Sequence, residues 1–371
     1  MEIWRIKEEL QKVKDPRRQW GNIRHKLDEI LIIGLCSVIC CGEDFTDMED
    51  FGDDREEWLR SFLELNNGIP DSDTFRRVFE RIDPHALADS LNSWLDAAGQ
   101  SGGRSVNLDG KTICGSKNPE HSAYHVVSAW VSENSITLGE LAVEEKSNEI
   151  TAIPELLDLI DVEGDIITID AMGCQEDIAQ KIRKKGADYV LALKDNHPTL
   201  HADVADYFDW IEKEQPKSET IDHYKSKPEK GHGRIETREI LTACADWLED
   251  KDNWKDLQTI IRYRCTREMN GVKSVSVRHY ISSFDTSAED FGAIIWGHWS
   301  IENQLHWILD VVFREDGARA KKDNSPLNFH ILRKIALAAL KKISVARLSV
   351  RRKMMKAARD PYFLARVLFE K

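Results

Sequence analysis

The first hundred residues repeat apolar side chains at the spacing of an amphipathic helix. One such face holds Leu27, Ile30, Leu31 and Leu35. Farther along, the run Asp71-Ser72-Asp73 supplies an N-cap for a second helix. The apolar face of that helix consists of Phe75, Val78, Phe79 and Ile82. We therefore predict a helical N-terminal domain over residues 1–98, followed by a linker at Gln100–Arg104.

After this linker the apolar pattern changes to a period of two. It predicts strands over residues 105–109, 124–131 and 136–143, close enough in sequence to form an antiparallel meander. Two more strands, 165–170 and 189–193, alternate with helices near 150–160, 175–185 and 198–214. Such alternation is typical of the parallel part of a sheet. Residues 99–214 are thus expected to begin an α/β core with a mixed five-stranded sheet and flanking helices.

Residues 215–284 do not continue this alternation. They contain polar loop sequence and two further strands, 259–265 and 275–282, separated by the hairpin signal Asn270-Gly271. We predict a β-rich insertion here. A helical pattern returns near Ala288, so residues 285–371 are expected to complete the core and to end in basic helices.

Charge is distributed unevenly along the chain. The net charge is −13 over 371 residues, but residues 314–371 hold 16 Lys and Arg against 5 Asp and Glu, a net of 16 − 5 = +11. The other 313 residues therefore carry −24. This asymmetry is expected of a protein with one nucleic-acid-facing surface, and a solvated basic helix explains it equally well. The candidate phosphate contacts here are Arg347, Arg351, Arg352, Lys353, Lys356 and Arg359.

Several classes of protein are excluded by what the sequence lacks. No uncharged apolar run reaches 18 residues, so no membrane span is predicted, and the apolar run 30–41 lacks a secretory cleavage site. The expected location is the cytoplasm. The seven cysteines form no CxxC pair, which excludes a zinc ribbon, and Cys36 and Cys40 are expected to pack in a core. The sequence also lacks the HExxH motif of metalloproteases and the GxGxxG motif of dehydrogenases.

Three acidic residues stand at positions suited to metal binding. Asp109 and Asp170 each end a predicted apolar strand, where a carboxylate points into the crevice that open α/β sheets use for ligands. Neighbouring carboxylates repel each other unless a cation lies between them, and hard oxygen ligands suit Mg²⁺. Glu302 shares a predicted helix face with Trp299 and His306, and that helix can return to the two aspartates after the insertion.

Each acid also has a simpler interpretation. Asp109 before a glycine is ordinary turn chemistry, Asp170 can cap the next helix, and Glu302 can be an exposed helical residue. The ordered set is less easily explained in that way. If Glu302 is not the third ligand, Asp310 or Asp316 is the next candidate.

The sequence resembles the DDE transposases of bacterial insertion sequences, in the subgroup that contains the H-repeat-associated proteins. The matching segments are Gly68–Phe79, Leu108-Asp109-Gly110-Lys111, Ile169–Gly173, Ala192–His197, Gly231-His232-Gly233-Arg234 with the residues up to Arg238, His298–Asn303, His306-Trp307, Asp310-Val311 and Glu315-Asp316. The resemblance covers nearly the whole chain. One departure concerns the Tyr-Arg-Glu-Lys signature of related transposases, because Trp296 or Trp299 stands in place of its tyrosine and no lysine follows Glu302 at the expected distance.

This resemblance implies an RNase H-like catalytic core with a β-rich insertion before the glutamate. It implies that Asp109, Asp170 and Glu302 hold Mg²⁺, with Mn²⁺ tolerated, and that the protein cleaves DNA strands and transfers them. The implied partner is double-stranded DNA at the terminal inverted repeats of its own element, bound by a homodimer with no membrane involved. In the cytoplasm, the protein would lie at the nucleoid when it is on DNA.

Further residues are candidates for DNA contacts. Lys111, Lys194 and Asn196 follow the predicted strand ends, and Arg234 lies in a glycine-flanked loop that can approach a phosphate closely. Arg76 and Arg77 lie on the capped N-terminal helix, and Arg351 and Arg352 lie in the basic C-terminal stretch. Two other functions remain open: a two-metal nuclease without strand transfer, and a domesticated, non-catalytic DNA-binding protein.

Overall fold

One mixed sheet organises half of the molecule. The computed structural model describes residues 3–17, 23–95, 102–119, 122–133, 135–143, 149–214, 221–231, 233–345 and 347–370, so the first two residues of the predicted linker, Gln100 and Ser101, lie outside them. Within these residues the sheet has ten strands in the order β3-β2-β1-β4-β5-β10-β9-β8-β6, with β7 paired to β8. The strands are β1 (Ser105–Thr112), β2 (His125–Val131), β3 (Ile136–Val143), β4 (Ile166–Ile169), β5 (Asp188–Leu193), β6 (Ile221–Lys225), β7 (Glu229–Gly231), β8 (Arg234–Cys244), β9 (Thr259–Met269) and β10 (Val272–Ser282).

The first five strands have the predicted arrangement. β1, β2 and β3 form an antiparallel meander, and β4 and β5 add to β1 in parallel. The predicted helices between them are confirmed as α7 (Glu149–Leu159), α8 (Glu176–Lys184) and α9 (Pro198–Glu214). One boundary is wrong, because β1 does not end at Asp109. Pairing with β2 continues as far as Thr112, so Asp109 lies inside the strand.

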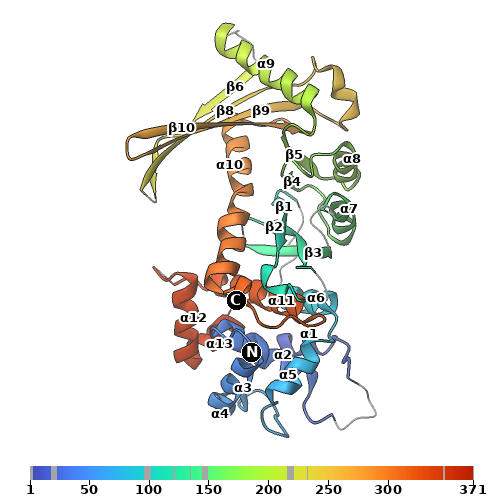
Figure 1. Ribbon diagram of the computed structural model, residues 1–371, viewed down its shortest axis with the longest axis vertical. Coiled ribbons are helices and arrows are strands. Elements are labelled where there is room, and N and C mark those ends of the chain that lie inside the picture. Colours follow the sequence, from blue (N-terminus) through green and yellow to red (C-terminus); the bar gives the residue numbers. More distant parts are fainter. Residues whose placement is uncertain are drawn as a thin grey trace.

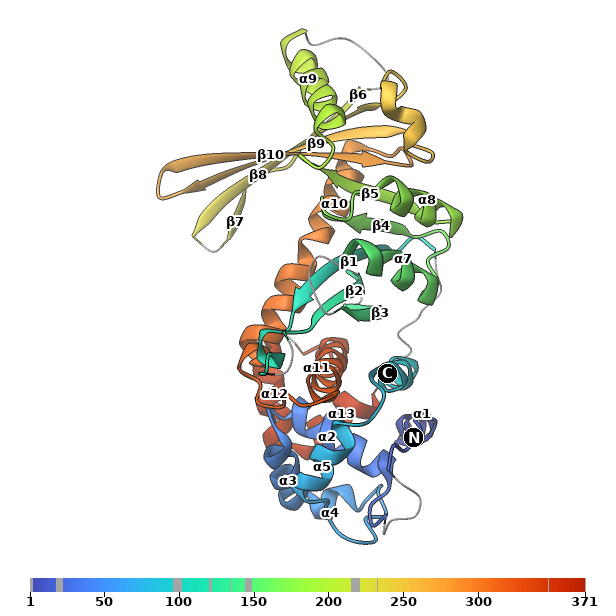
Figure 2. The same cartoon turned by 45° about the vertical axis from the view of Figure 1, so that its right-hand side comes forward.

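The segment predicted as an insertion extends the same sheet. β10 pairs antiparallel with β5 through residues 279–282, and β9, β8 and β6 follow outward, so the sheet has ten strands rather than five. The predicted hairpin at Asn270-Gly271 is confirmed, and both residues have the positive φ that this turn requires. Because residues 272–278 of β10 continue beyond the end of β5, strands β7 to β10 project as an arm (Figure 2).

A helical body forms the other end of the molecule (Figure 1). It contains α1 (Ile3–Leu10), α2 (Leu27–Ile39), α3 (Phe45–Asp54), α4 (Glu56–Leu59), α5 (Ser72–Phe79), α6 (Pro84–Leu95), α11 (Ser325–Lys342), α12 (Val350–Arg359) and α13 (Pro361–Phe369). The predicted N-cap of α5 is confirmed, since the Asp71 carboxylate accepts a hydrogen bond from the Thr74 amide.

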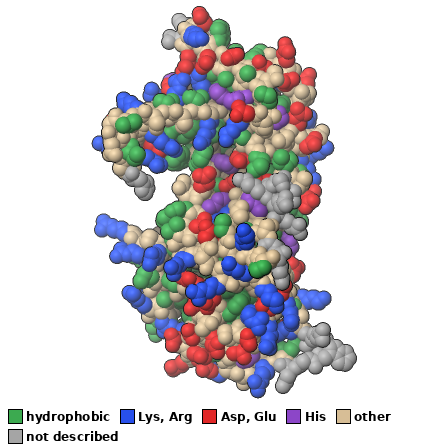
Figure 3. Space-filling model, viewed as in Figure 1, with side chains coloured by type: hydrophobic (Ala, Val, Ile, Leu, Met, Phe, Trp, Pro, Cys, Tyr) green, Lys and Arg blue, Asp and Glu red, His purple; other side chains and the backbone are tan. Residues whose placement is uncertain are grey.

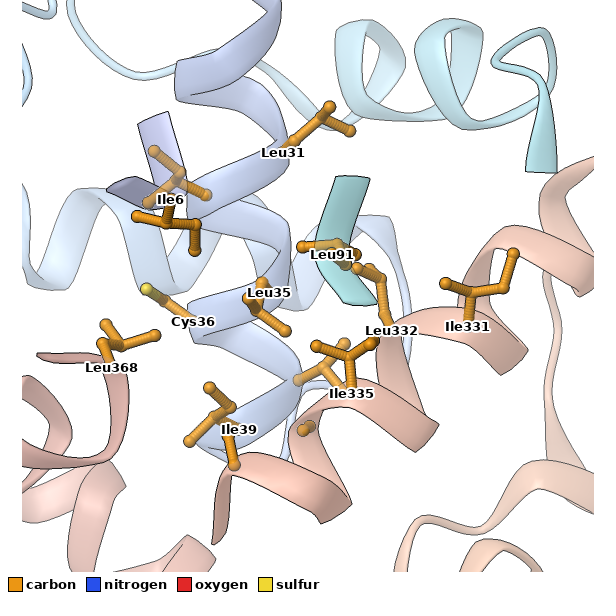
Figure 4. Packing of buried hydrophobic residues seen from close by; sticks show 14 of the residues in the cluster. Ile6, Leu31, Leu35, Cys36, Ile39, Leu91, Ile331, Leu332, Ile335 and Leu368 are labelled. Carbon is orange, nitrogen blue, oxygen red and sulfur yellow. The ribbon is translucent and has the colours of Figure 1, made fainter. Parts of the chain in front are cut away.

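Helices from the two ends of the chain share one hydrophobic core. Figure 4 shows Leu35 of α2 pointing toward Leu332 and Ile335 of α11. The buried Cys36 belongs to this core, as its predicted packing role requires. The C-terminal helices thus pack on the N-terminal ones.

A long helical segment joins the helical body to the sheet. It begins with α10 (Ala288–His298), which packs across β8, β6, β1 and β4. It continues through two π-helical stretches, Glu302–His306 and Ile308–Val312, toward the helical body. Short 3-10 helices lie at Cys114–Ser116, Glu249–Asn253 and Glu315–Gly317. Within the described ranges, no helix has the length and apolar character needed to span a membrane.

Candidate active site

Asp109 and Asp170 are brought together by the parallel pairing of β1 with β4. The last paired residues are Leu108 and Ile169, and the two aspartates follow them at the same edge of the sheet. Asp170 is exposed, and its carboxylate accepts hydrogen bonds from the amides of Met172 and Gly173 at 3.0 and 3.3 Å. The Asp170 carboxylate thus closes the turn after β4 and does not cap α8, whose N-cap residue is Gln175.

The third acid lies close enough to affect the charge of Asp109. Burial raises the pKa of Asp109 to about 7, and the amide of Gly110 opposes this shift. The negative charges of Asp170, Glu302 and Glu149 add to it, in that order. Because repulsion between carboxylates grows as they approach, Asp170 and Glu302 both add to the raised pKa of Asp109.

These carboxylates do not form a closed cage. Among the residues with a described position, no three His, Cys, Asp or Glu side chains are placed to hold a metal ion by themselves. The donor set still fits Mg²⁺, which usually binds through one or two carboxylates and keeps waters and substrate phosphates as its other ligands. The mutual repulsion at Asp109 is also what a cation would relieve.

Glu302 begins the first π-helical stretch, a form that occurs frequently at functional sites. Four residues later, His306 places Nδ1 3.5 Å from Oδ2 of Asp109. Burial lowers the pKa of His306 to about 3, so its ring is neutral and this contact is not an ion pair. Trp299 does not join them, because its ring stacks against the Arg278 guanidinium at 3.8 Å.

A buried polar network lies directly behind the two aspartates. The Thr168 hydroxyl donates to Oδ1 of Asn107 at 2.7 Å and also contacts Nδ1 of His298 at 2.7 Å. The hydroxyl has only one proton, so Nδ1 of His298 must be the donor in the second bond. Burial lowers the pKa of His298 to about 4, against the charge of Asp170. The network therefore ties α10, which leads to Glu302, to the strands that carry Asp109 and Asp170.

Gly110 is explained by a second buried group. His125 pairs with Glu149 beside the backbone of β1, and a Cβ at position 110 would collide with both side chains. A glycine after Asp109 is thus needed for close approach. The sequence analysis assigns no role to His125, Glu149 or His298; polar residues inside apolar strands, such as Asn107 and Thr168, are the available signal.

The reserve acids have different surroundings. Asp310 lies 2.7 Å from Nζ of Lys111, which is also 2.9 Å from the buried Glu315. Asp316 is exposed. Since Lys111 is buried between two carboxylates, a phosphate contact by this lysine would require both ion pairs to break.

The segment after β5 supports the loop that follows Asp170. Asn196 donates hydrogen bonds to the carbonyls of Ala171 and Cys174 at 2.8 and 3.2 Å. Its amide nitrogen is thus engaged with the protein. Lys194, in contrast, is exposed.

The predicted arginines lie on three separate surfaces. Arg234, at the tip of the arm, is 41% exposed and pairs with Glu236 at 2.9 Å, and its neighbour His232 lies outside the described residues. Arg76 pairs with Asp73 and Glu80 along α5, and Arg77 is more exposed. The last pair, Arg351 and Arg352, is exposed on α12.

Not every basic residue of α12 faces solvent. Lys353 is buried and donates hydrogen bonds to the carbonyls of Leu340 and Ile343, so it caps α11. On the face drawn in Figure 3, acidic and histidine side chains gather at mid-height below the arm, and Lys and Arg side chains lie on the arm and on the helical body.

Comparisons with known proteins agree on one family. A model described as "Transposase DDE domain" matches residues 96–339, and one described as "DDE_Tnp_1-associated" matches residues 7–95. The chain is 39% identical to "Putative transposase YncI" of Escherichia coli O157:H7, with 95% of this chain and 91% of that protein covered. It is 38% identical to "H repeat-associated putative transposase YhhI" of Escherichia coli strain K12, with coverages of 99% and 98%. A shorter relative in that strain, "Inactive transposase YbfQ", is 37% identical over 21% of this chain.

Proposed function

The chain belongs to the DDE transposase family, and from that premise we propose that it cleaves DNA at the ends of its own element and joins the freed strand to a target. Asp109, Asp170 and Glu302 are the proposed metal ligands and catalytic residues. The observation that carries this proposal is the adjacency of Asp109 and Asp170 after a parallel strand pair, with the charge of Glu302 acting on Asp109.

Each proposed step is an in-line displacement at phosphorus. Water first attacks the phosphodiester and a 3′-oxygen leaves. The resulting 3′-hydroxyl then attacks a phosphodiester of the target, and the 3′-oxygen of the target strand leaves. Divalent ions held by these three acids would activate the attacking oxygen and stabilise the leaving one. The chain contributes the positions of the ligands: β1 holds Asp109, the loop after β4 holds Asp170, and the π-helical stretch holds Glu302.

We assign Mg²⁺ to this site, with Mn²⁺ as a substitute. We also assign the core to the RNase H-like type, and the strand order β3-β2-β1-β4-β5 supports this fold type. The proposed substrate is double-stranded DNA at terminal inverted repeats, bound by two copies of the chain at the nucleoid. Basic residues at the surface would contact its phosphates, namely the exposed Lys194, Arg77, Arg351 and Arg352 and the half-buried Arg234 and Arg76. Lys111 and Asn196 would instead support the site.

The decisive test is cleavage of a labelled element-end duplex with Mg²⁺. We expect the wild-type protein to nick the duplex and the Asp170→Ala variant to lose this activity. Asp203→Ala is the matched control, because Asp203 is an exposed aspartate on α9 away from the sheet edge. Full cleavage by Asp170→Ala would refute the ligand assignment.

The same reaction separates the alternative functions. Strand-transfer products identify a transposase, whereas nicking without joining identifies a nuclease. One relative bears the name "Inactive transposase YbfQ", so a non-catalytic DNA-binding protein is a real alternative. Tight end binding without cleavage by the wild-type protein, in Mg²⁺ and in Mn²⁺, would favour it.

A further inference from the structure

We propose that His306 is a positioning residue for Asp109, and that the ion pairs of Lys111 with Asp310 and Glu315 fix the rotation of the helix that carries Glu302. This inference rests on the proposed function, because it concerns how the metal ligands are oriented. It assigns roles to three features that the ligand set itself leaves unexplained: the π-helical turns, a histidine beside Asp109 and a buried cluster of ion pairs.

The π-helical turns align residues that an ordinary helix would spread apart. In an α-helix, four residues overshoot one full turn by about 40°, so positions repeating every fourth residue drift around the axis. Here the amide of Trp307 bonds to the carbonyl of Glu302, and that of Phe313 bonds to Ile308, so each turn holds more residues. The apolar side chains at every fourth position are all buried: Ile301, Leu305, Leu309 and Phe313.

The next stripe of the same helix carries the polar residues. Glu302, His306 and Asp310 also repeat every fourth position, each directly after one of the buried apolar residues. Burial of the apolar stripe therefore determines where these three side chains point. Two of them, His306 and Asp310, reach side chains of β1.

Strand β1 offers two matching positions on one face. Asp109 and Lys111 are two residues apart, so their side chains lie on the same side of the strand. His306 is 3.5 Å from Asp109, and Asp310 is 2.7 Å from Lys111. These two contacts, His306–Asp109 and Asp310–Lys111, are successive contacts between the helix and the strand. Among described side chains, His306 is the one cationic or imidazole group within ion-pair distance of Asp109.

The Asp310–Lys111 contact continues to a buried group of ion pairs. Lys111 also contacts Glu315, which is fully buried and bound to His330 of α11 at 2.8 Å. Arg333 of α11 lies 3.6 Å from the same carboxylate. The backbone of Glu315 packs so closely on Gly115 that a Cβ there would collide with it. The rotation of the helix is therefore held from the helical body, and the position of His306 against Asp109 follows from it.

The test measures Mn²⁺ binding by calorimetry on the full-length protein with an uncleaved element-end duplex. Residues that orient metal ligands typically contribute about 10–100-fold in affinity. We expect Asp109→Asn to abolish binding and His306→Leu to weaken it by roughly tenfold. His306→Asn should restore most of the affinity, because its amide can occupy the place of Nδ1. The control is His223→Gln, which removes another histidine bound to a carboxylate, Glu239 on the outer strands.

A second pair of variants tests the contact between Asp310 and Lys111. Asp310→Asn should weaken Mn²⁺ binding by a few fold, less than His306→Leu, and Asp316→Asn, its exposed neighbour in sequence, should not change it. Circular dichroism and metal-free end binding should match the wild type for every variant.

The possible outcomes distinguish this inference from the proposed function. If His306→Leu binds Mn²⁺ as tightly as the wild type while Asp109→Asn does not bind it, the positioning role is wrong and the ligand assignment stands. If Asp310→Asn abolishes binding as completely as Asp109→Asn, Asp310 is a ligand, and the proposed role of its ion pair in fixing the helix rotation is wrong. If the wild-type protein binds no Mn²⁺, the proposed function fails and this inference fails with it.

Discussion

Replacing Thr168 with valine tests the network behind the aspartates. The exchange keeps the shape of the side chain and removes the hydroxyl that bridges Asn107 and His298. Both partners would keep a buried polar atom without a bond, and each such atom costs about 1–3 kcal/mol. We therefore expect Thr168→Val to lower the free energy of unfolding by roughly 2–6 kcal/mol.

Two comparisons make this prediction specific to the hydroxyl. Thr168→Ser keeps the bridge and loses one methyl group, which should cost only about 1 kcal/mol. Thr242→Val changes another buried strand threonine, whose hydroxyl has no hydrogen bond with the residues described, so its effect should be small.

The assay is urea unfolding followed by tryptophan fluorescence, with midpoints compared at unchanged slope. Cleavage should also decrease in Thr168→Val, because α10 leads directly to Glu302. If valine costs no more than serine, the hydroxyl does not bridge the two groups as argued.

Two further predictions concern pH and salt. Burial, with His201 and Arg262 nearby, lowers the pKa of His279 to about 4, while Asp209 opposes the shift. As the pH falls, the unfolded state therefore takes up the proton before the folded state does. The free energy of unfolding should thus decrease by on the order of 3 kcal/mol between about pH 6.5 and about pH 4. His279→Phe should flatten that loss in acid unfolding experiments, and an unchanged slope would contradict it. The double variant Arg351→Ala/Arg352→Ala should reduce the slope of log K against log salt for end binding by about 2. The control Lys184→Ala/Lys185→Ala, at the C-terminal end of α8, should leave the slope unchanged. Equal slopes in the two double variants would exclude α12 from the DNA surface.

The core of the sheet was predictable because its signals are local. Period-two strands and intervening helices are short patterns, and α9 begins and ends at the predicted residues Pro198 and Glu214. The adjacency of Asp109 and Asp170 also followed, since parallel strands place their carboxyl ends at one edge.

The features that the sequence did not predict depend on distant partners. Gly110 and Lys111 suggested a turn, but β2 pairs with both residues, and Glu315, 204 residues away, neutralises the buried lysine. Similarly, the sequence does not predict that α11 packs on α2 and α6. Short-range patterns carry no information about either contact.

The position of Glu302 depends on a pattern that a search for helices passes over. Apolar residues at 301, 305, 309 and 313 match neither the α-helical repeat nor the period of a strand, yet all four are buried. In a regular α-helix, the same four positions would be spread over about 120°, and Glu302, His306 and Asp310 would drift around the helix axis by about 80°. A related chain that keeps three acids but loses this four-residue repeat would have the ligands without their alignment. Three conserved acids in a sequence are therefore weaker support for an active transposase than the acids together with the apolar stripe beside them.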